Sequence, residues 1–298
     1  MQIKKRVLIV GAGDVAQRAI PWLRKRFRVY ALVRQQSAFA SLRAQGVTPL
    51  LGDLDQALTL KRISSLAQWI LHFAPPQNQG HQDKRTKHLL AHLSNVRDAR
   101  PSLPRRLVYI STTGVYGDCQ GRWVAETCPV NPESARAQRR VDAEIQLRQW
   151  AKRTHTRLCI LRAPGIYAQD RLPLARIEQQ TPVLLAEEDV YTNHIHAEDL
   201  ARVACKALLI GKPQRIYNAA DGSAIKMGDY FDAVARAYQY PLPPRMPRHT
   251  LKVFLSPVSY SFMQESRRIK NLRLMRELKV SLQYPSTYKF LNMQISRY

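Results

Sequence analysis

Short apolar runs alternate with longer segments whose apolar positions recur every three or four residues through the first 165 residues of the chain. The short runs are typical of strands buried on both faces, and the longer segments are typical of amphipathic helices. The pattern predicts strands at Arg6–Val10, Val29–Val33, Val47–Leu51, Trp69–Phe73, Leu107–Ile110 and Leu158–Leu161, and helices reaching about Arg26 and at Ala38–Ala44, Lys84–Ala99 and Arg136–Arg153. This alternation predicts an α/β fold with a doubly wound parallel sheet.

The pattern becomes irregular after about residue 163. It predicts, in order, an extended segment at Val190–Ile195, a helix at Ala197–Ile210, a strand at Ile216–Ala219, a proline-stiffened loop at 241–247 and a helix at Ser266–Leu278. We therefore expect a first domain at 1–165 built on the sheet and a small mixed lobe at 166–298 that binds the substrate. Residues 190–220 are expected to return to the first domain's sheet.

The chain is strongly basic, with a net charge of +25 from 47 Lys and Arg against 22 Asp and Glu. Such an excess raises the possibility of a nucleic-acid partner. The basic residues are scattered, however, and no helix-turn-helix, zinc-finger or RNP pattern is present. We therefore expect only weak, salt-sensitive association with nucleic acid and no specific nucleic-acid partner.

Histidine and cysteine spacing predicts neither a metal site nor a redox motif. His88 and His92 lie one helical turn apart in HLLAH, which lacks the acidic residue of a zinc protease, and the four cysteines form no CxxC. No stretch has the length of a signal peptide's apolar region or of a membrane span. We interpret the protein as cytoplasmic, without a membrane partner.

The segment VLIVGAGDVAQRA carries a G-x-G-x-x-A motif at Gly11, Gly13 and Ala16. A glycine motif alone is weak, but this one follows a buried strand and opens a helix, the context of a Rossmann-type dinucleotide site. Gly11 allows the tight turn, Gly13 allows close approach of a pyrophosphate, and Ala16 allows tight packing of helix on strand. The alternative is a plain strand–helix turn.

The end of the second predicted strand, ALVRQQS, places Arg34 where Rossmann proteins select their cofactor. An acidic residue there holds the ribose 2′-hydroxyl of NAD, whereas an arginine accepts the 2′-phosphate of NADP. We therefore predict NADP as the cofactor, with NAD as the alternative. A solvated arginine at a strand end is the competing interpretation.

The segments VLIVGAGDVA, LLGDLD, ISTTGVYGD, LRAPGIY and NHIHAEDLA, in this order, resemble the extended short-chain dehydrogenase/reductases, also called NAD-dependent epimerase/dehydratases. The resemblance continues into YNAADG at 217–222 and covers nearly the whole chain. It implies cofactor contacts from Gly11, Gly13, Asp14, Val15, Asp53, Leu54 and Ala74, a catalytic hydroxyl at Thr112, a substrate contact at Asn193 and structural roles for His196 and Asp199.

The family's catalytic Tyr-x-x-x-Lys pair is replaced in this chain. The resemblance implies a tyrosine at 136, a lysine at 140 and an acid at 144, but the chain has Arg136, Arg140 and Glu144. Arginine stays protonated at neutral pH, so Arg136 cannot transfer a proton and suits an anionic substrate group instead. Arg140 can still contact the cofactor ribose. Alternatively, an i,i+4 pair of Arg140 with Glu144 makes this only a charged helix face.

A replacement proton carrier is needed if the protein is an enzyme. Tyr191, close to Asn193 in sequence, is the favoured candidate over Tyr116, Tyr167 and Glu126. The sequence thus favours an NAD(P)-dependent oxidoreductase or epimerase that acts on a small polar substrate, and Arg136 favours an anionic one. The alternative is a non-catalytic NADP-binding redox sensor or scaffold. Either a monomer or a homodimer is compatible with the sequence.

Overall fold

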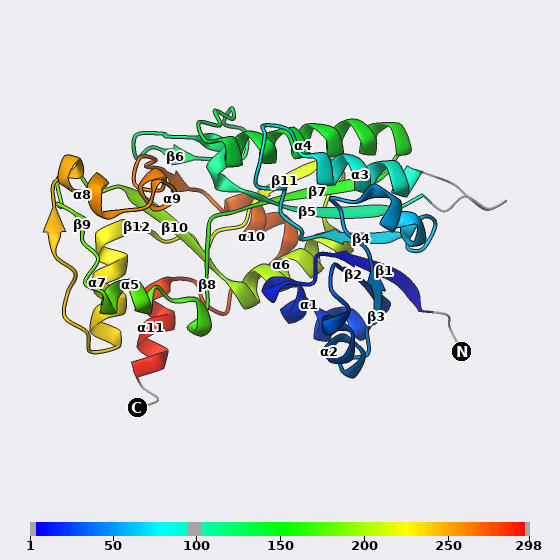
Figure 1. Cartoon of the computed structure of the whole chain (residues 1–298), viewed down its shortest axis with the longest axis horizontal. Helices are drawn as coiled ribbons and strands as arrows, with labels where there is room; N and C mark the ends of the chain where they lie inside the picture. The colour runs from blue at the N-terminus through cyan, green and yellow to red at the C-terminus, as the bar shows by residue number, and fades with distance from the viewer. Residues whose placement is uncertain (1–3, 95–102, 296–298) are drawn as a thin grey trace.

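A seven-stranded parallel sheet forms the centre of the computed structural model, which describes residues 4–94 and 103–295 (Figure 1). Its strands are β1 (Lys5–Val10), β2 (Phe27–Val33), β3 (Thr48–Leu51), β4 (Trp69–His72), β5 (Arg106–Thr112), β7 (Arg157–Ala163) and β11 (Arg215–Asn218). The strand order is β11-β7-β5-β4-β1-β2-β3. The order reverses beside β1, and open sheets of this kind bind ligands at the carboxyl ends of the strands next to such a reversal.

Helices cover both faces of this sheet, which explains why its strands are almost continuously apolar. One face carries α1 (Asp14–Arg24), α2 (Phe39–Ala44), α6 (Ala197–Ile210) and α10 (Leu272–Leu278), and the other carries α3 (Lys84–Ser94), α4 (Ala135–Thr154) and the 3₁₀ helix η2 (Ala57–Ile63). Figure 1 shows α3 and α4 on the side of the sheet opposite α1 and α6. Each face has its own core, with Leu200 and Leu274 in one and Leu89 and Trp150 in the other.

A smaller lobe lies beside the sheet and is built on three short strands (Figure 1). They are β8 (Gly165–Tyr167), β10 (Tyr191–His196) and β12 (Ala224–Lys226), and the lobe's helices are α5 (Leu174–Glu178), α7 (Met227–Ala237), α8 (Arg248–Phe254), α9 (Pro257–Ser261) and α11 (Thr287–Ile295). Tyr167, Ile177, Phe231 and Phe290 share its apolar core.

Several short elements complete the two parts of the fold. Two-residue strands pair β9 (Val183–Leu184) with β13 (Arg245–Met246), and β6 (Trp123–Val124) with β14 (Arg268–Ile269). The remaining 3₁₀ turns are η1 (Gln36–Ala38), η3 (Thr113–Tyr116) and η4 (Gln169–Arg171). The β6–β14 pair attaches the late segment 265–270 to the loop that follows η3, and this attachment shapes one side of the site.

The α/β fold class and the six predicted strands of the first half are confirmed, but two later predictions are wrong in part. The helix predicted at Ser266–Leu278 begins only at Leu272, because the backbone amides of Arg268 and Lys270 donate to Arg122 and Val124 in the β6–β14 pair. Within 190–220, β11 joins the seven-stranded sheet, whereas β10 pairs with β8 and β12 in the lobe. The predicted end of the helix at Lys84–Ala99 lies partly outside the described residues.

Two kinds of feature are absent from residues 4–94 and 103–295. No helix there is long and apolar enough to cross a bilayer. No group of three His, Cys, Asp or Glu side chains in the same residues is placed to hold a metal ion.

Candidate functional site

A cavity of about 630 Å³ opens at the carboxyl ends of β1, β2 and β4, where the strand order reverses. We call it the glycine-loop cavity. All of the cofactor-binding residues predicted above line it, namely Gly11, Gly13, Asp14, Val15, Arg34, Asp53, Leu54, Ala74 and Arg140. Residues spread over 130 positions therefore meet at one place because parallel strands end at the same edge of the sheet.

The two glycines of the motif meet different constraints. Gly11 has φ +88°, and a Cβ there would lie 2.7 Å from the backbone nitrogen of Ala74, so the fold itself requires glycine. Gly13 has no heavy atom within 4 Å of where a Cβ would be. It also precedes α1 without any side-chain cap. Open space and uncapped amides at a helix N-terminus suit a bound phosphate, so these residues fit the pyrophosphate of a dinucleotide.

Charges at the far end of the glycine-loop cavity come from the segments after β2 and β3. Arg34 follows β2 and is exposed at the cavity edge. Asp55 lies nearby and binds Arg85 through both carboxylate oxygens, at 2.7 and 2.5 Å. The hydrogen bonds from Arg85 lower the pKa of Asp55, and the charge of Arg34 adds to this effect. The acids that line the cavity are Asp14 and Asp53, and neither follows β2.

The carboxylate of Asp14 is already engaged by two arginines. It accepts from Arg18 at 2.8 Å and from Arg171 at 3.0 Å. Asp14 therefore joins the start of α1 to η4, and its backbone amide, which α1 does not use, is the group suited to a cofactor contact.

A second cavity of about 720 Å³ adjoins the first and shares Ile166, Arg140 and Arg171 with it. It lies between α4, the lobe strand β10 and the helices α5 and α7. The predicted catalytic and substrate residues Thr112, Arg136, Tyr191 and Asn193 all line this second cavity. The residues predicted from the sequence therefore line two adjoining cavities, and their roles stay predictions.

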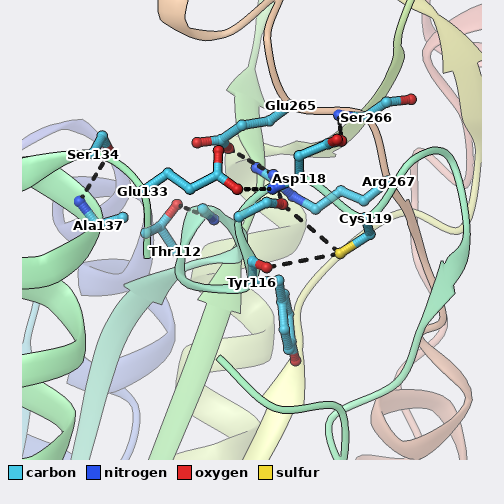
Figure 2. A network of polar contacts seen from close by, with 12 residues as sticks. Thr112, Tyr116, Asp118, Cys119, Glu133, Ser134, Ala137, Glu265, Ser266 and Arg267 are labelled. Carbon is cyan, nitrogen blue, oxygen red and sulfur yellow. Dashed lines mark hydrogen bonds and ion pairs between the residues drawn. The ribbon is translucent and has the colours of Figure 1, made fainter. Parts of the chain in front are cut away.

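Thr112 ends β5 and caps the turn η3. Its Oγ1 accepts from the backbone amide of Gly114 at 3.1 Å, a contact drawn in Figure 2. Because the hydroxyl oxygen is used as an acceptor, its hydrogen is free to donate to a group in the second cavity. This geometry suits a side chain that polarises a carbonyl or hydroxyl oxygen.

Arg140 lies at the junction of the two cavities, and two groups of the sheet strand β5 hold its guanidinium in place. Its Nη1 donates to the backbone carbonyl of Ile110 at 2.7 Å and to the hydroxyl of Tyr109 at 2.9 Å. The pair with Glu144 considered from the sequence is wrong, because Glu144 binds Arg162 at 2.7 and 3.0 Å. Glu144 is buried and comes within reach of β7, so it turns inward and away from Arg140.

Arg136 lies one turn before Arg140 on α4 and lines the second cavity. Its guanidinium stacks on the ring of Phe262, with 4.3 Å between the guanidinium carbon and the ring centroid. No carboxylate of the described residues lies within ion-pair distance of it. Burial lowers the pKa of Arg136, and the charge of Glu265 opposes this effect only in part, because the ion pair of Glu265, at 2.6 Å, is with Arg267.

Three further arginines line the second cavity and were missed from the sequence: Arg171, Arg176 and Arg267. With Arg136 and Arg140 they make five guanidinium groups, against the single carboxylate of Glu265 among the lining residues. The only sequence signal was the scattered excess of arginine, because these residues lie as many as 131 positions apart. The cavity is therefore suited to an anionic molecule.

The four candidate proton carriers lie in different parts of the structure. Tyr191 lines the second cavity, with Lys226 and Arg268 each 4.8 Å from its ring centroid. Tyr116 and Glu126 are buried against Asn218. The hydroxyl of Tyr116 donates to the side-chain oxygen of Asn218 at 2.8 Å, and the backbone amide of Asn218 donates to Glu126 at 3.0 Å. Tyr167 is buried in the lobe core. These three do not line either cavity.

His194 and Tyr230 also line the second cavity and stack on each other, with 4.3 Å between ring centroids. Burial lowers the pKa of His194 to about 4, so its imidazole is neutral at pH 7. Burial also raises the pKa of Tyr230. Neither group is poised to exchange a proton near neutral pH.

Asn193 fits a positioning role better than the substrate contact expected from the sequence. Its side-chain nitrogen donates to the carbonyl of Arg267 at 2.8 Å, and its oxygen accepts from the amide of Ile269 at 2.8 Å. Both ends of the amide therefore hold the segment that carries Arg267. Figure 2 shows part of this segment, in which the amide of Ser266 donates to Asp118.

His196 and Asp199 have the structural roles implied by the resemblance. The ring of His196 accepts from the amide of Glu198 and caps α6. The carboxylate of Asp199 accepts from the amides of Gln283 and Tyr284 at 2.9 and 2.8 Å. Together they tie β10 and α6 to the segment before α11.

Solved structures similar to this chain share its whole architecture. A conserved protein of unknown function from Silicibacter pomeroyi is 28% identical, with a TM-score of 0.81 and 99% coverage of both chains. A UDP-glucose 4-epimerase from Thermotoga maritima is 14% identical, with a TM-score of 0.77, over 98% of this chain and 97% of the other. A dTDP-glucose 4,6-dehydratase from Streptomyces venezuelae with NAD bound is 17% identical, with a TM-score of 0.78, over 98% and 96%.

No curated protein matches the chain in a sequence search. The model of the NAD dependent epimerase/dehydratase family matches residues 7–220, which include the glycine motif, Thr112, α4 and β10. The match therefore extends over the seven-stranded sheet, the glycine-loop cavity and part of the second cavity. The chain belongs to the NAD-dependent epimerase/dehydratase family.

Proposed function

We propose that this protein is an NADP-dependent oxidoreductase or epimerase that acts on a small anionic substrate. In this proposal Arg136 and Arg140 stand where most relatives have a catalytic tyrosine and lysine. The observation that carries the proposal is Arg140, which Ile110 and Tyr109 hold at the junction of the two cavities. If this part of α4 were only a charged helix face, the guanidinium of Arg140 would instead point toward solvent or toward Glu144.

The cofactor is assigned to the glycine-loop cavity. The backbone from Gly11 to Val15 would hold its pyrophosphate, Arg34 its 2′-phosphate and Arg140 its nicotinamide ribose. When bound, a nicotinamide cofactor accepts or supplies hydride. Similar structures contain NAD, and the preference for NADP rests on Arg34, because no lining acid follows β2 to repel a phosphate.

The second cavity is assigned to the substrate. Thr112 donates its hydroxyl hydrogen to the substrate oxygen, and Arg136 binds an anionic group. Arg136 keeps its own proton, so another side chain must exchange the proton of the reaction. We assign this exchange to Tyr191, which lines the cavity and is only partly buried.

Nucleotide titration tests the cofactor assignment. We expect the protein to bind NADPH more tightly than NADH by calorimetry, and Arg34→Glu to remove the preference because it replaces the phosphate's partner with a repelling charge. Arg28→Glu makes the same charge change at the exposed start of β2 and serves as the control. Equal or tighter binding of NADH by the unaltered protein would contradict the assignment.

The two arginines of α4 are tested in the same way. Arg140→Met should weaken NADPH binding by about 10- to 100-fold, the value of a hydrogen bond to a charged group. Arg136→Met should leave NADPH affinity nearly unchanged. Arg153→Met removes an exposed charge from the last turn of the same helix as a control. An unchanged NADPH affinity in Arg140→Met would show that these residues are only a solvated face.

A redox sensor or scaffold that binds NADP without turnover is the second candidate, and the arginine at position 136 favours it. A panel of small keto and hydroxy acids, followed through NADPH absorbance, separates the two. Turnover that Tyr191→Phe lowers by about 10²- to 10⁴-fold supports the enzyme. Tight NADPH binding without turnover of any acid, together with a cofactor-dependent change in partner binding, supports the sensor.

A further inference from the structure

The five arginines of the second cavity fall into two groups. Arg140 is held by Tyr109 and Ile110, Arg171 forms an ion pair with Asp14, and Arg267 forms one with Glu265. Arg136 and Arg176 have no ion pair in the described part of the chain. Each of these two rests instead on an aromatic ring. Among the described residues, three of the lining cations therefore lack a protein anion, but Arg140 has two neutral acceptors in β5, so Arg136 and Arg176 are the two that the protein satisfies least.

Arg176 is the less satisfied of the two. Its Nη2 lies 3.4 Å from the carbonyl of Pro182, at the long limit of a hydrogen bond, and its Nε is buried with no acceptor. Its guanidinium carbon lies 4.4 Å from the ring centroid of Phe231. Burial lowers the pKa of Arg176, which reflects the cost of keeping this charge away from water. Such a cation is ordinarily paired, so the unused donors point to a ligand.

Arg136 and Arg176 stand on different walls of the same cavity. Arg136 belongs to α4, on the side of the sheet, whereas Arg176 belongs to α5, in the lobe. Phe262 supports the first guanidinium and Phe231 the second. Aromatic stacking leaves the edge of each guanidinium fork available for carboxylate or phosphate oxygens. The cavity volume of about 720 Å³ lies in the range of small-molecule sites.

We propose that Arg176 forms a second anion-binding subsite, so that the substrate is a small molecule with one anionic group at each end. Arg136 takes the group at the α4 end and Arg176 takes the group in the lobe. The inference rests on the proposed function for the identity of the cavity as a substrate site. Arg176 then determines specificity, because a substrate with a single anionic group leaves its partly buried charge unpaired.

Calorimetric titration with simple acids tests this inference. The probes are the linear dicarboxylates from malonate to pimelate, each compared with the monocarboxylate of equal chain length, with and without saturating NADPH. We expect at least one dicarboxylate to bind about 10- to 100-fold more tightly than its monocarboxylate. Arg176→Met should abolish this difference and leave monocarboxylate affinity unchanged.

Two further variants keep the test decisive. Arg236→Met removes an exposed arginine from the neighbouring helix α7 and should retain the full dicarboxylate advantage. Arg176→Lys keeps the charge but loses the planar fork, and it should retain part of the advantage even if the methionine variant folds poorly. Circular dichroism checks the folding of each variant.

Three results would overturn the inference. They are the absence of any dicarboxylate advantage at every chain length, its persistence in Arg176→Met, and an equal loss in Arg236→Met, which would indicate bulk charge alone. Failure of the protein to bind NADPH would instead contradict the proposed function. The two failures are distinguishable because the acids are titrated with and without the nucleotide.

Discussion

Asp221 gives a quantitative prediction about how stability depends on pH. This residue follows β11 and is buried, and its Oδ1 accepts from the amide and the hydroxyl of Ser223 at 2.9 and 2.7 Å. Its Oδ2 is buried without a hydrogen-bond partner. Burial raises the pKa of Asp221 from 3.8 to about 7. The folded protein therefore holds a proton that the unfolded chain releases in mildly acidic solution.

The sign and size of the effect follow from linkage. Between pH 4 and 7 the unfolded state binds fewer protons at this group than the folded state, so the free energy of unfolding falls as pH rises. The shift of about three units corresponds to about 4 kcal/mol. The stability associated with this proton is complete below pH 4 and is lost by about pH 8. Asp221→Asn cannot ionise and keeps a carbonyl oxygen for Ser223, so it avoids this loss.

Urea unfolding of the wild type and of Asp221→Asn at several values between pH 4.5 and 8.5 measures the effect. The variant's advantage in free energy of unfolding should grow toward about 4 kcal/mol as pH rises, because the other titrating groups cancel in the difference. Glu178→Gln removes an acid from an exposed position on α5 and serves as the control for the loss of one carboxylate. A constant difference for Asp221→Asn, or one that shrinks with rising pH, would refute the reasoning.

The remaining predictions concern the glycine loop and the buried ion pair. Gly13→Ala should keep its melting temperature but bind NADPH more weakly by calorimetry, because its Cβ enters open space in the cavity; unchanged affinity would contradict the site. Gly11→Ala should lose about 1–3 kcal/mol in urea unfolding because of its positive φ and the contact with Ala74. Glu144→Gln should cost about 3–5 kcal/mol, since Arg162 stays buried without its anion, and a loss below about 1 kcal/mol would argue against that burial.

The fold and the glycine-loop cavity were predictable because their signals are local. An apolar run and a glycine turn specify β1, Gly11 and α1 within a few residues of each other. Parallel strands then end at one edge, so Arg34 and Asp53 necessarily approach the same cavity. Nothing beyond strand order is needed to bring them together.

Contacts between distant segments were not predictable from spacing. Position along α4 suggested a pair between Arg140 and Glu144, but Arg162 of β7 binds Glu144 and leaves Arg140 to the end of β5. The helical pattern at 266–278 likewise did not produce a helix over its first part, because Arg268 and Ile269 pair with β6. In both cases a partner from another element offers a buried interaction that outweighs the local preference.

The arginines of the second cavity show the same limit. Arg171, Arg176 and Arg267 look like ordinary surface charges in the sequence. Only the packing of the lobe against the sheet turns them toward a common space. The net charge indicated an excess of arginine but carried no information about where it gathers.

The helix α10 has a consequence for the order in which the protein can be completed during synthesis. Leu274 and Leu278 are fully buried in the same core as α1 and α6, and Glu277 pairs with Arg215 of β11. The sheet, whose first strand begins at Lys5, therefore receives this covering element only after the segment up to Leu278 has left the ribosome. A nascent chain that stops before Leu272 exposes apolar surface on α6 and β11, where it would need a chaperone's protection from aggregation.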